Sequence, residues 1–138
     1  TEGGLAVEGE QPKLKEAIKR LQAEEIEVSL FIDPTLSAVK SSLELGVEWI
    51  EFHTGKYANI YAMLFSNLAN TPHSILELEL SRKELSSMLK EEINNLQLLS
   101  AKAIEIGLKV AAGHGLNYQN IEAIANIKSI KELNIGQS

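Results

Sequence analysis

The sequence predicts an α/β fold with parallel strands, and more closely half of a (β/α)8 barrel. Short apolar strands alternate with amphipathic helices, each strand runs into a proline or glycine, and three of the strands carry a polar residue in their interior. Alternating strands and helices require parallel strands with covering helices. A whole barrel needs about 250 residues, and these 138 residues supply four strands of eight.

The chain begins with a predicted helix, a strand and a second helix. After Pro12, apolar residues recur at helical spacing at Leu14, Ala17, Ile18 and Leu21. The apolar run Val28–Ile32 predicts a strand, which Pro34 stops. Thr35 can cap the next helix, which runs through Leu36, Val39 and Leu43 and closes at Gly46.

A second strand, Trp49–His53, precedes a long helical region. Apolar residues form one helical stripe up to Gly107, at Leu85, Met88, Leu89, Ile93, Leu96, Leu99, Ala103 and Ile106. We therefore expect one long helix that ends at Gly107, with further helical material over Tyr57–Leu80 in front of it.

Two strands and one helix complete the chain. The strands are Leu108–Ala112, which runs into Gly113, and Glu132–Ile135, which runs into Gly136, with a helix over Tyr118–Ile127 between them. No linker divides the sequence, so residues 1–138 are predicted to be a single domain. In barrel numbering it contains loop and helix 4 and strands 5 to 8.

Two parallel architectures fit this order, an open doubly wound sheet and a TIM (β/α)8 barrel. The polar residues inside the strands, Ser29, Glu51 and Lys109, favour the barrel. A central strand of an open sheet is covered by helices on both faces and rarely buries such residues. We therefore predict the second half of a TIM barrel.

The composition excludes several classes of protein. The chain carries 13 basic and 19 acidic side chains, net −6, without a basic block, so nucleic acid is not an expected partner. It has no cysteine, which excludes disulfides and thiolate metal sites and favours the cytoplasm. No apolar run or leader indicates a membrane. The start at Thr1, within a loop-like stretch, indicates a cut chain.

Glu51 is the most informative carboxylate. Strand alternation places Trp49, Glu51 and His53 on one face and Ile50 and Phe52 on the other, so Glu51 is expected to point into the barrel. A buried carboxylate is costly unless it is paired, hydrogen-bonded or protonated. It therefore belongs either to a structural network or to a catalytic site.

Glycines and histidines gather where the predicted strands end, which is where barrel active sites are built. In Gly113–Gly115 the two glycines leave backbone N–H groups free to bind an anion, and His114 is expected to face the mouth of the barrel. The alternative is a turn with an exposed histidine. Gly136 ends the next strand, and loops after the last two barrel strands commonly bind phosphate. For His53 and Asp33, a structural histidine and a helix-capping aspartate are favoured.

Five motifs in this order resemble the pyridoxine 5′-phosphate synthase family. They are Thr1–Leu5 (TEGGL), Val28–Asp33 (VSLFID), Ile50–Gly55 (IEFHTG), Ala112–Leu116 (AGHGL) and Glu132–Gly136 (ELNIG). The resemblance covers the second half of the family's barrel, with an apparent insertion at about residues 58–80.

The resemblance implies a cofactor-free transferase of vitamin B6 biosynthesis without a metal. It would condense 3-amino-2-oxopropyl phosphate with 1-deoxy-D-xylulose 5-phosphate to give pyridoxine 5′-phosphate, phosphate and water. It implies His114 as proton donor, Glu51 as transition-state stabiliser, and Gly115, Gly136 and Gln137 as substrate-binding residues. It further implies that Thr1–Leu5 is a loop that closes over the site, and that the protein is a cytoplasmic homo-octamer.

Two positions depart from the family pattern, and two alternatives remain. Gln137 stands where the family usually has His, and Ala111 where Asn is common. The family's first-half strands supply a further acid–base histidine, a catalytic glutamate and phosphate-binding arginines, and no residue here can take those roles. The alternatives are a non-catalytic half-barrel that only self-associates, and another phosphate-binding barrel enzyme.

Overall fold

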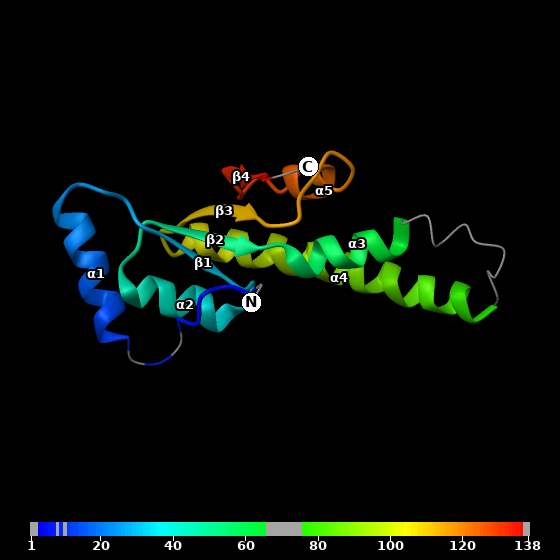
Figure 1. Cartoon of the computed structure of the whole chain (residues 1–138), viewed down its shortest axis with the longest axis horizontal. Helices are drawn as coiled ribbons and strands as arrows, with labels where there is room; N and C mark the ends of the chain where they lie inside the picture. The colour runs from blue at the N-terminus through cyan, green and yellow to red at the C-terminus, as the bar shows by residue number, and fades with distance from the viewer. Residues whose placement is uncertain (1–2, 8, 10, 66–75, 137–138) are drawn as a thin grey trace.

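The computed structural model describes residues 3–7, 9, 11–65 and 76–136, apart from the side chains of residues 76–80. Helices and strands alternate as the sequence predicts (Figure 1). The elements are α1 (Pro12–Ala23), β1 (Ser29–Ile32), α2 (Leu36–Leu45), β2 (Trp49–His53), α3 (Gly55–Phe65), α4 (Leu76–Glu105), β3 (Lys109–Gly113), α5 (Ile121–Ala125) and β4 (Glu132–Asn134).

The four strands form one parallel sheet in the order β1-β2-β3-β4. This confirms the predicted parallel α/β organisation. A doubly wound sheet reverses its strand order at a switch point, and the described sheet runs in sequence order without reversal. Its two edges are β1 and β4, as expected for consecutive strands of a larger structure.

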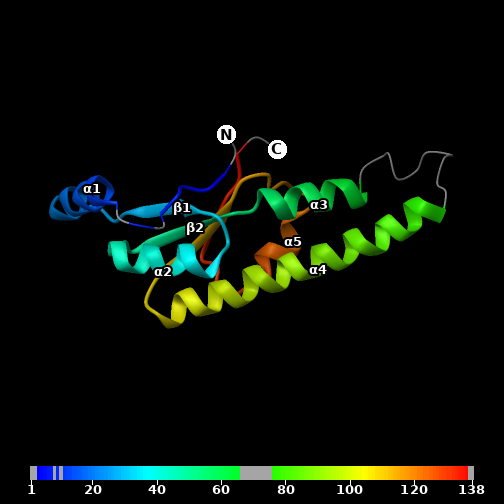
Figure 2. The same ribbon diagram turned by 90° about the horizontal axis from the view of Figure 1, so that it is seen from below.

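The two faces of the sheet differ sharply. On one face α2 and α4 pack against the strands and against each other (Figure 2). That face is fully buried and apolar, and consists of Leu30, Ile32, Ile50, Phe52, Val110 and Ala112. Ser29, Glu51 and Lys109 share the opposite face, as the strand register requires. Ser29 and Lys109 are exposed and Glu51 is half-buried, because nothing in the described residues fully covers this face.

The ends of α2 follow the sequence prediction. The Thr35 hydroxyl accepts a hydrogen bond from the Ala38 N–H at 3.2 Å, and Gly46 ends the helix with a φ of +80°. The prediction that Asp33 caps this helix is wrong, since Thr35 takes that position. The Asp33 carboxylate instead accepts a hydrogen bond from the Gly4 N–H at 2.9 Å.

Several predicted boundaries differ from the structure, and β1 begins at Ser29, one residue later than predicted. β3 begins and ends one residue later than predicted, and β4 ends one residue earlier. Of the helix predicted over Tyr118–Ile127, only α5 forms, because the Asn117 side chain accepts hydrogen bonds from the N–H groups of Gln119 and Asn120 and bends the chain into a turn.

The helical material predicted over Tyr57–Leu80 divides into α3 and the start of α4, while residues 66–75 lie outside the described residues. α3 and α4 pack side by side and extend beyond the sheet (Figures 1 and 2). The Tyr57 hydroxyl of α3 donates to the Asn120 carbonyl, and burial raises the pKa of Tyr57 to about 12. The phenol therefore stays a hydrogen-bond donor at neutral pH, and links α3 to the turn before α5.

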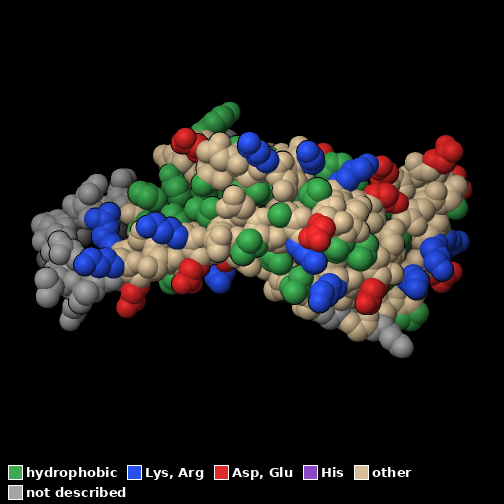
Figure 3. Space-filling view, turned by 180° about the vertical axis from the view of Figure 1, so that it is seen from behind, with side chains coloured by type: hydrophobic (Ala, Val, Ile, Leu, Met, Phe, Trp, Pro, Cys, Tyr) green, Lys and Arg blue, Asp and Glu red, His purple; other side chains and the backbone are tan. Residues whose placement is uncertain are grey.

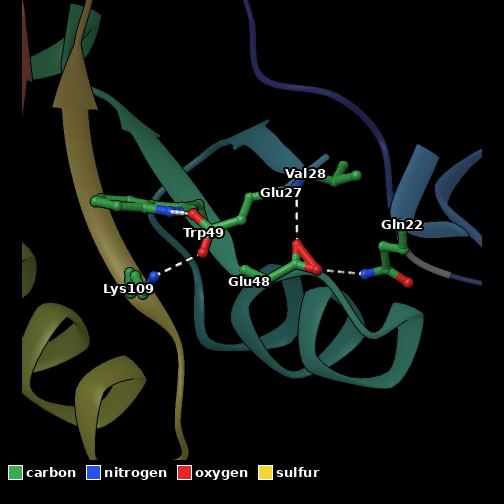
Figure 4. Close-up of polar contacts among 6 residues, drawn as sticks. All are labelled: Gln22, Glu27, Val28, Glu48, Trp49 and Lys109. Atoms are coloured by element: carbon green, nitrogen blue, oxygen red, sulfur yellow. Dashed lines mark hydrogen bonds and ion pairs between the residues drawn. The ribbon is translucent and has the colours of Figure 1, made fainter. Parts of the chain in front are cut away.

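The amino ends of the strands carry a satisfied polar cluster (Figure 4). Glu27 accepts from Trp49 Nε1 and pairs with Lys109 Nζ, each at 2.8 Å, and Lys109 also lies 5.4 Å from the centre of the Trp49 ring. Beside it, Glu48 accepts from the Val28 N–H at 2.7 Å and from Gln22 Nε2 at 2.6 Å. Lys109, which was predicted to point into the barrel, is thus paired with a carboxylate at this end of the sheet.

The outer surface mixes side chains of both charges. Figure 3 shows lysine and arginine interspersed with aspartate and glutamate on one face, with hydrophobic side chains gathered near the far end of the α3–α4 pair. In the described part of the chain, no helix combines the length and apolar character needed to cross a membrane.

Candidate active site

A hollow of about 480 Å³ lies at the carboxyl ends of the strands. Asp33 lines it from the end of β1, His53 from β2 and His114 from the residue after β3, while Lys56 and Asn59 of α3 close one side. Parallel strands present their carboxyl ends at the same edge, which is where barrels bind their ligands. The structure therefore brings His114 and His53 together in one hollow.

His114 sits in a strained backbone conformation. Its φ is +86°, and Gly115 follows with a φ of +77°. The left-handed region costs a residue with a Cβ about 1–2 kcal/mol, so surrounding contacts must hold His114 there. Such strain is concentrated at functional sites. The side chain is exposed, which leaves the imidazole accessible to a ligand.

His53 forms the floor beneath His114. The two rings stack with their centroids 4.4 Å apart, and Phe31 stacks on the other face of His53 at 5.0 Å. His53 Nδ1 accepts from the Gly55 N–H at 3.0 Å, while its buried Nε2 has no hydrogen-bond partner among the described residues. A Cβ at Gly55 would lie 2.2 Å from the His53 ring, so only glycine fits there. The interpretation of His53 as structural agrees with its burial.

Glu51 lies against the backbone of β3. A Cβ at Gly113 would come within 2.3 Å of Glu51 Oε1, so the glycine makes room for the carboxylate. No hydrogen bond or ion pair to this carboxylate is found within the described residues. The sequence prediction treated Glu51 as buried; it is half-buried, because the face it occupies is open in this chain.

The two glycine turns lie on neighbouring strands. β3 and β4 pair Gly113 with Asn134, so Gly115 and Gly136 each come two residues after a paired position. Gly136 is exposed, and a Cβ there would meet nothing within 4 Å. Its value as a binding residue would therefore come from its backbone N–H. Gln137, the third predicted binding residue, lies outside the described residues.

The segment before α1 approaches the same hollow. Gly3 lines it, and the Leu5 N–H donates to the Phe31 carbonyl of β1. Gly4 passes so close to β1 that a Cβ would lie 2.3 Å from the Asp33 nitrogen. The second of the two consecutive glycines, Gly4, is thus explained by the close approach of two backbone segments.

Comparison with known proteins identifies the family. Residues 1–138 match the family described as "Pyridoxal phosphate biosynthesis protein PdxJ". The chain belongs to the PdxJ family. A protein from a Sulfurovum species, named "Pyridoxine 5'-phosphate synthase", is 70% identical over all 138 residues, which make up 54% of its own length.

Further relatives carry the same name. The protein from Aliarcobacter butzleri is 59% identical and that from a Nitratiruptor species is 55% identical, each over 138 residues. The chain spans about half the length of the curated relatives it matches. The range that matches the PdxJ family, residues 1–138, runs across the segment interpreted as an insertion.

Sequence reasoning did not foresee how two residues near His114 are placed. His53 was visible as the last residue of a predicted strand, yet nothing in the sequence places its ring under His114. Thr54, which is 1% exposed, resembles an ordinary residue before a helix. Its contacts with the chain around His114 join positions about 60 residues apart, and only the structure reveals them.

Proposed function

We propose that this chain forms the second half of a TIM (β/α)8 barrel enzyme, a pyridoxine 5′-phosphate synthase. The enzyme condenses 3-amino-2-oxopropyl phosphate with 1-deoxy-D-xylulose 5-phosphate, and releases pyridoxine 5′-phosphate, phosphate and water. The observation that carries the proposal is the identity of 70% across the whole chain with a protein of that name. The hollow at the carboxyl ends of the strands supports it independently, because barrel enzymes bind substrate there.

Proton transfer is the role we assign to His114. Imine formation, dehydration and ring closure each require a proton to move at a fixed place, and a histidine titrates in the range that suits this. The His114 ring is exposed to the hollow on one side and supported by His53 on the other. We therefore assign it the role of proton donor.

Charge stabilisation is the role we assign to Glu51. Its carboxylate lies against Gly113 and is not engaged by another described group. A carboxylate in a site from which water is excluded stabilises positive charge that develops in the transition state. Closure of the barrel by four further strands would cover the face on which Glu51 stands.

Phosphate anchoring is the role we assign to Gly115, Gly136 and Gln137. Backbone N–H groups at strand-end turns donate hydrogen bonds readily to anions, and the loops after the last two barrel strands commonly bind phosphate. The register of β3 and β4 supports a shared site for Gly115 and Gly136. We also propose that the enzyme is a cytoplasmic homo-oligomer, as the motif resemblance implies, without metal or cofactor.

The test uses a hybrid, defined as the Sulfurovum relative with its matching residues replaced by this chain. The hybrid supplies the remaining part of the protein from a relative that is 70% identical over this chain. Incubated with both substrates, it should form pyridoxine 5′-phosphate, detected by mass spectrometry. A folded hybrid that consumes neither substrate would contradict the proposed function.

The phosphate site is tested in the same hybrid. Gly115→Val introduces a side chain at a φ of +77°, where a Cβ would already lie 2.7 Å from Ala58 Cβ. Affinity for 3-amino-2-oxopropyl phosphate should fall at least tenfold. Unchanged affinity would remove Gly115 from the site.

A further inference from the structure

Thr54 joins the end of β2 to the residues that carry His114. It lies between β2 and α3 and is 1% exposed. Its hydroxyl lies 2.7 Å from the carbonyl oxygens of both Gly113 and His114, and its N–H donates to the Gly113 carbonyl at 2.8 Å. Three polar contacts of one buried residue thus converge on two consecutive carbonyls.

This use of the hydroxyl is unusual for a threonine that precedes a helix. Such a threonine ordinarily accepts a hydrogen bond from the first helical turn, as Thr35 does for α2. In the described residues, no N–H of α3 donates to the Thr54 hydroxyl, which serves as a donor to the end of β3 instead. The side chain therefore acts on the segment around His114 rather than on its own helix.

The contact with the His114 carbonyl also sets the direction of a neighbouring donor. The C=O of His114 and the N–H of Gly115 belong to one planar trans peptide unit, in which the two groups point in opposite directions. Holding the carbonyl on Thr54 therefore turns the Gly115 N–H away from it. That N–H donates to no group within the described residues, and Gly115 lines a second hollow of about 360 Å³, which, like the hollow that His114 lines, is lined by Asn59.

We propose that Thr54 is a positioning residue that orients the peptide between His114 and Gly115, so that the Gly115 N–H is aimed at the phosphate of the substrate. This inference rests on the proposed function, because it assigns Thr54 to that same phosphate site. The strained φ of His114 is held by the same hydrogen bond. One hydroxyl thus fixes the position of His114, the proton donor, and the direction of the Gly115 N–H, the hydrogen-bond donor to phosphate.

The loop keeps other supports when the hydroxyl is removed. Asn120 Nδ2 donates to the Gly115 carbonyl at 2.9 Å, and Asn120 Oδ1 accepts from the Asn117 N–H at 2.9 Å. These bonds do not involve Thr54. A Thr54→Val variant keeps the shape of the side chain, and is therefore expected to fold with its loop in place but with a freer His114–Gly115 peptide.

The experiment compares three variants in the hybrid. Thr54→Val removes the hydroxyl, Thr54→Ser retains it, and Ser42→Ala is the matched control. Ser42 is also fully buried and donates to a backbone carbonyl, that of Ala38 at 2.8 Å, within α2. Inorganic phosphate is titrated while the Gly115 amide is followed by NMR, and KM for the amino-ketone phosphate and kcat are measured separately.

Thr54→Val should weaken phosphate binding at the Gly115 amide at least tenfold and raise KM by a similar factor, while Thr54→Ser stays within threefold and Ser42→Ala is unchanged. The proposal is overturned if Thr54→Val binds phosphate as the unsubstituted hybrid does, or if Ser42→Ala causes an equal loss. A hybrid that makes no product contradicts the proposed function. The amide titration would still decide whether Thr54 orients the Gly115 N–H.

Discussion

The two ends of the sheet are built in opposite ways. At the amino ends, the carboxylates of Glu27 and Glu48 each accept two hydrogen bonds, and Lys109 is paired. At the carboxyl ends, Glu51 has no described partner, the buried Nε2 of His53 is unpaired among described residues, and His114 holds a strained backbone.

This contrast is the one expected if opposite ends of the sheet serve stability and the proposed function. A polar cluster in which every charged group has a partner holds strands in register. Unpaired polar groups and backbone strain instead lower stability, and no contact made on folding compensates for them. In barrels the amino-end face serves stability and the carboxyl-end face serves catalysis. We therefore expect a ligand at the carboxyl ends of the strands. Each substitution below alters one end of the sheet, and production of the chain by itself removes the rest of the protein from both ends.

The largest effect is expected when the 138-residue chain is made by itself. Its sheet has two open edges and an uncovered face carrying Glu51 and Lys109, and unpaired edges promote association. It should self-associate or unfold, and form no pyridoxine 5′-phosphate. Sedimentation and a product assay with both substrates test this. A stable monomer that makes product would show that no further strands are needed.

His114→Asn in the hybrid should remove the function of the carboxyl end while leaving the amino end intact. General acid–base groups contribute about 10²- to 10⁴-fold in rate, so kcat should fall by that factor with little change in KM. Single-turnover kinetics measure the chemical step. Glu51→Gln should behave likewise. Wild-type turnover in His114→Asn would reject the role of proton donor.

Gly113→Ala tests the space that β3 leaves for Glu51. The new Cβ would lie 2.3 Å from Glu51 Oε1 and 3.0 Å from the Asn134 carbonyl. Overpacking of this kind costs about 1–3 kcal/mol, and the displaced carboxylate should lower kcat by about tenfold, since misplacement by an ångström costs up to about 100-fold. Urea denaturation and steady-state kinetics measure the two effects. If both are unchanged, the carboxylate does not depend on this glycine.

Glu27→Gln should affect the stability of the protein and the pH dependence of that stability, and not the catalytic rate. Hydrogen bonds from Lys109 and then Trp49 hold the pKa of the Glu27 carboxyl below its usual value. The contribution of this carboxylate to stability is therefore fully present above the pKa that it has in the unfolded chain, and is lost as the pH falls through its lower pKa in the folded protein. The variant should melt slightly lower at neutral pH, lose this acid dependence and keep its kcat. A changed kcat would show that the two ends are coupled.

Local sequence signals were reliable where one residue decides the structure. Pro12 begins α1, Thr35 and Gly46 bound α2, and the alternation around Glu51 places it on the face that the register confirms. The prediction made the helix before β4 too long, because the side chain of Asn117 competes for the backbone N–H groups that a longer helix would use. Periodicity alone cannot report that competition.

The sequence by itself determined the parallel α/β order, the strand-end positions of His114 and Gly115, and the family. The order and the strand ends follow from hydrophobic period, capping residues and glycine turns, which act over a few neighbouring positions, whereas the family follows from the resemblance of five motifs to known proteins. The tertiary structure decided which distant groups meet. The ring of His53 under His114, and the hydroxyl of Thr54 on the carbonyls of Gly113 and His114, join segments about 60 residues apart. Such contacts depend on how strands pair and how side chains pack, which no local pattern encodes.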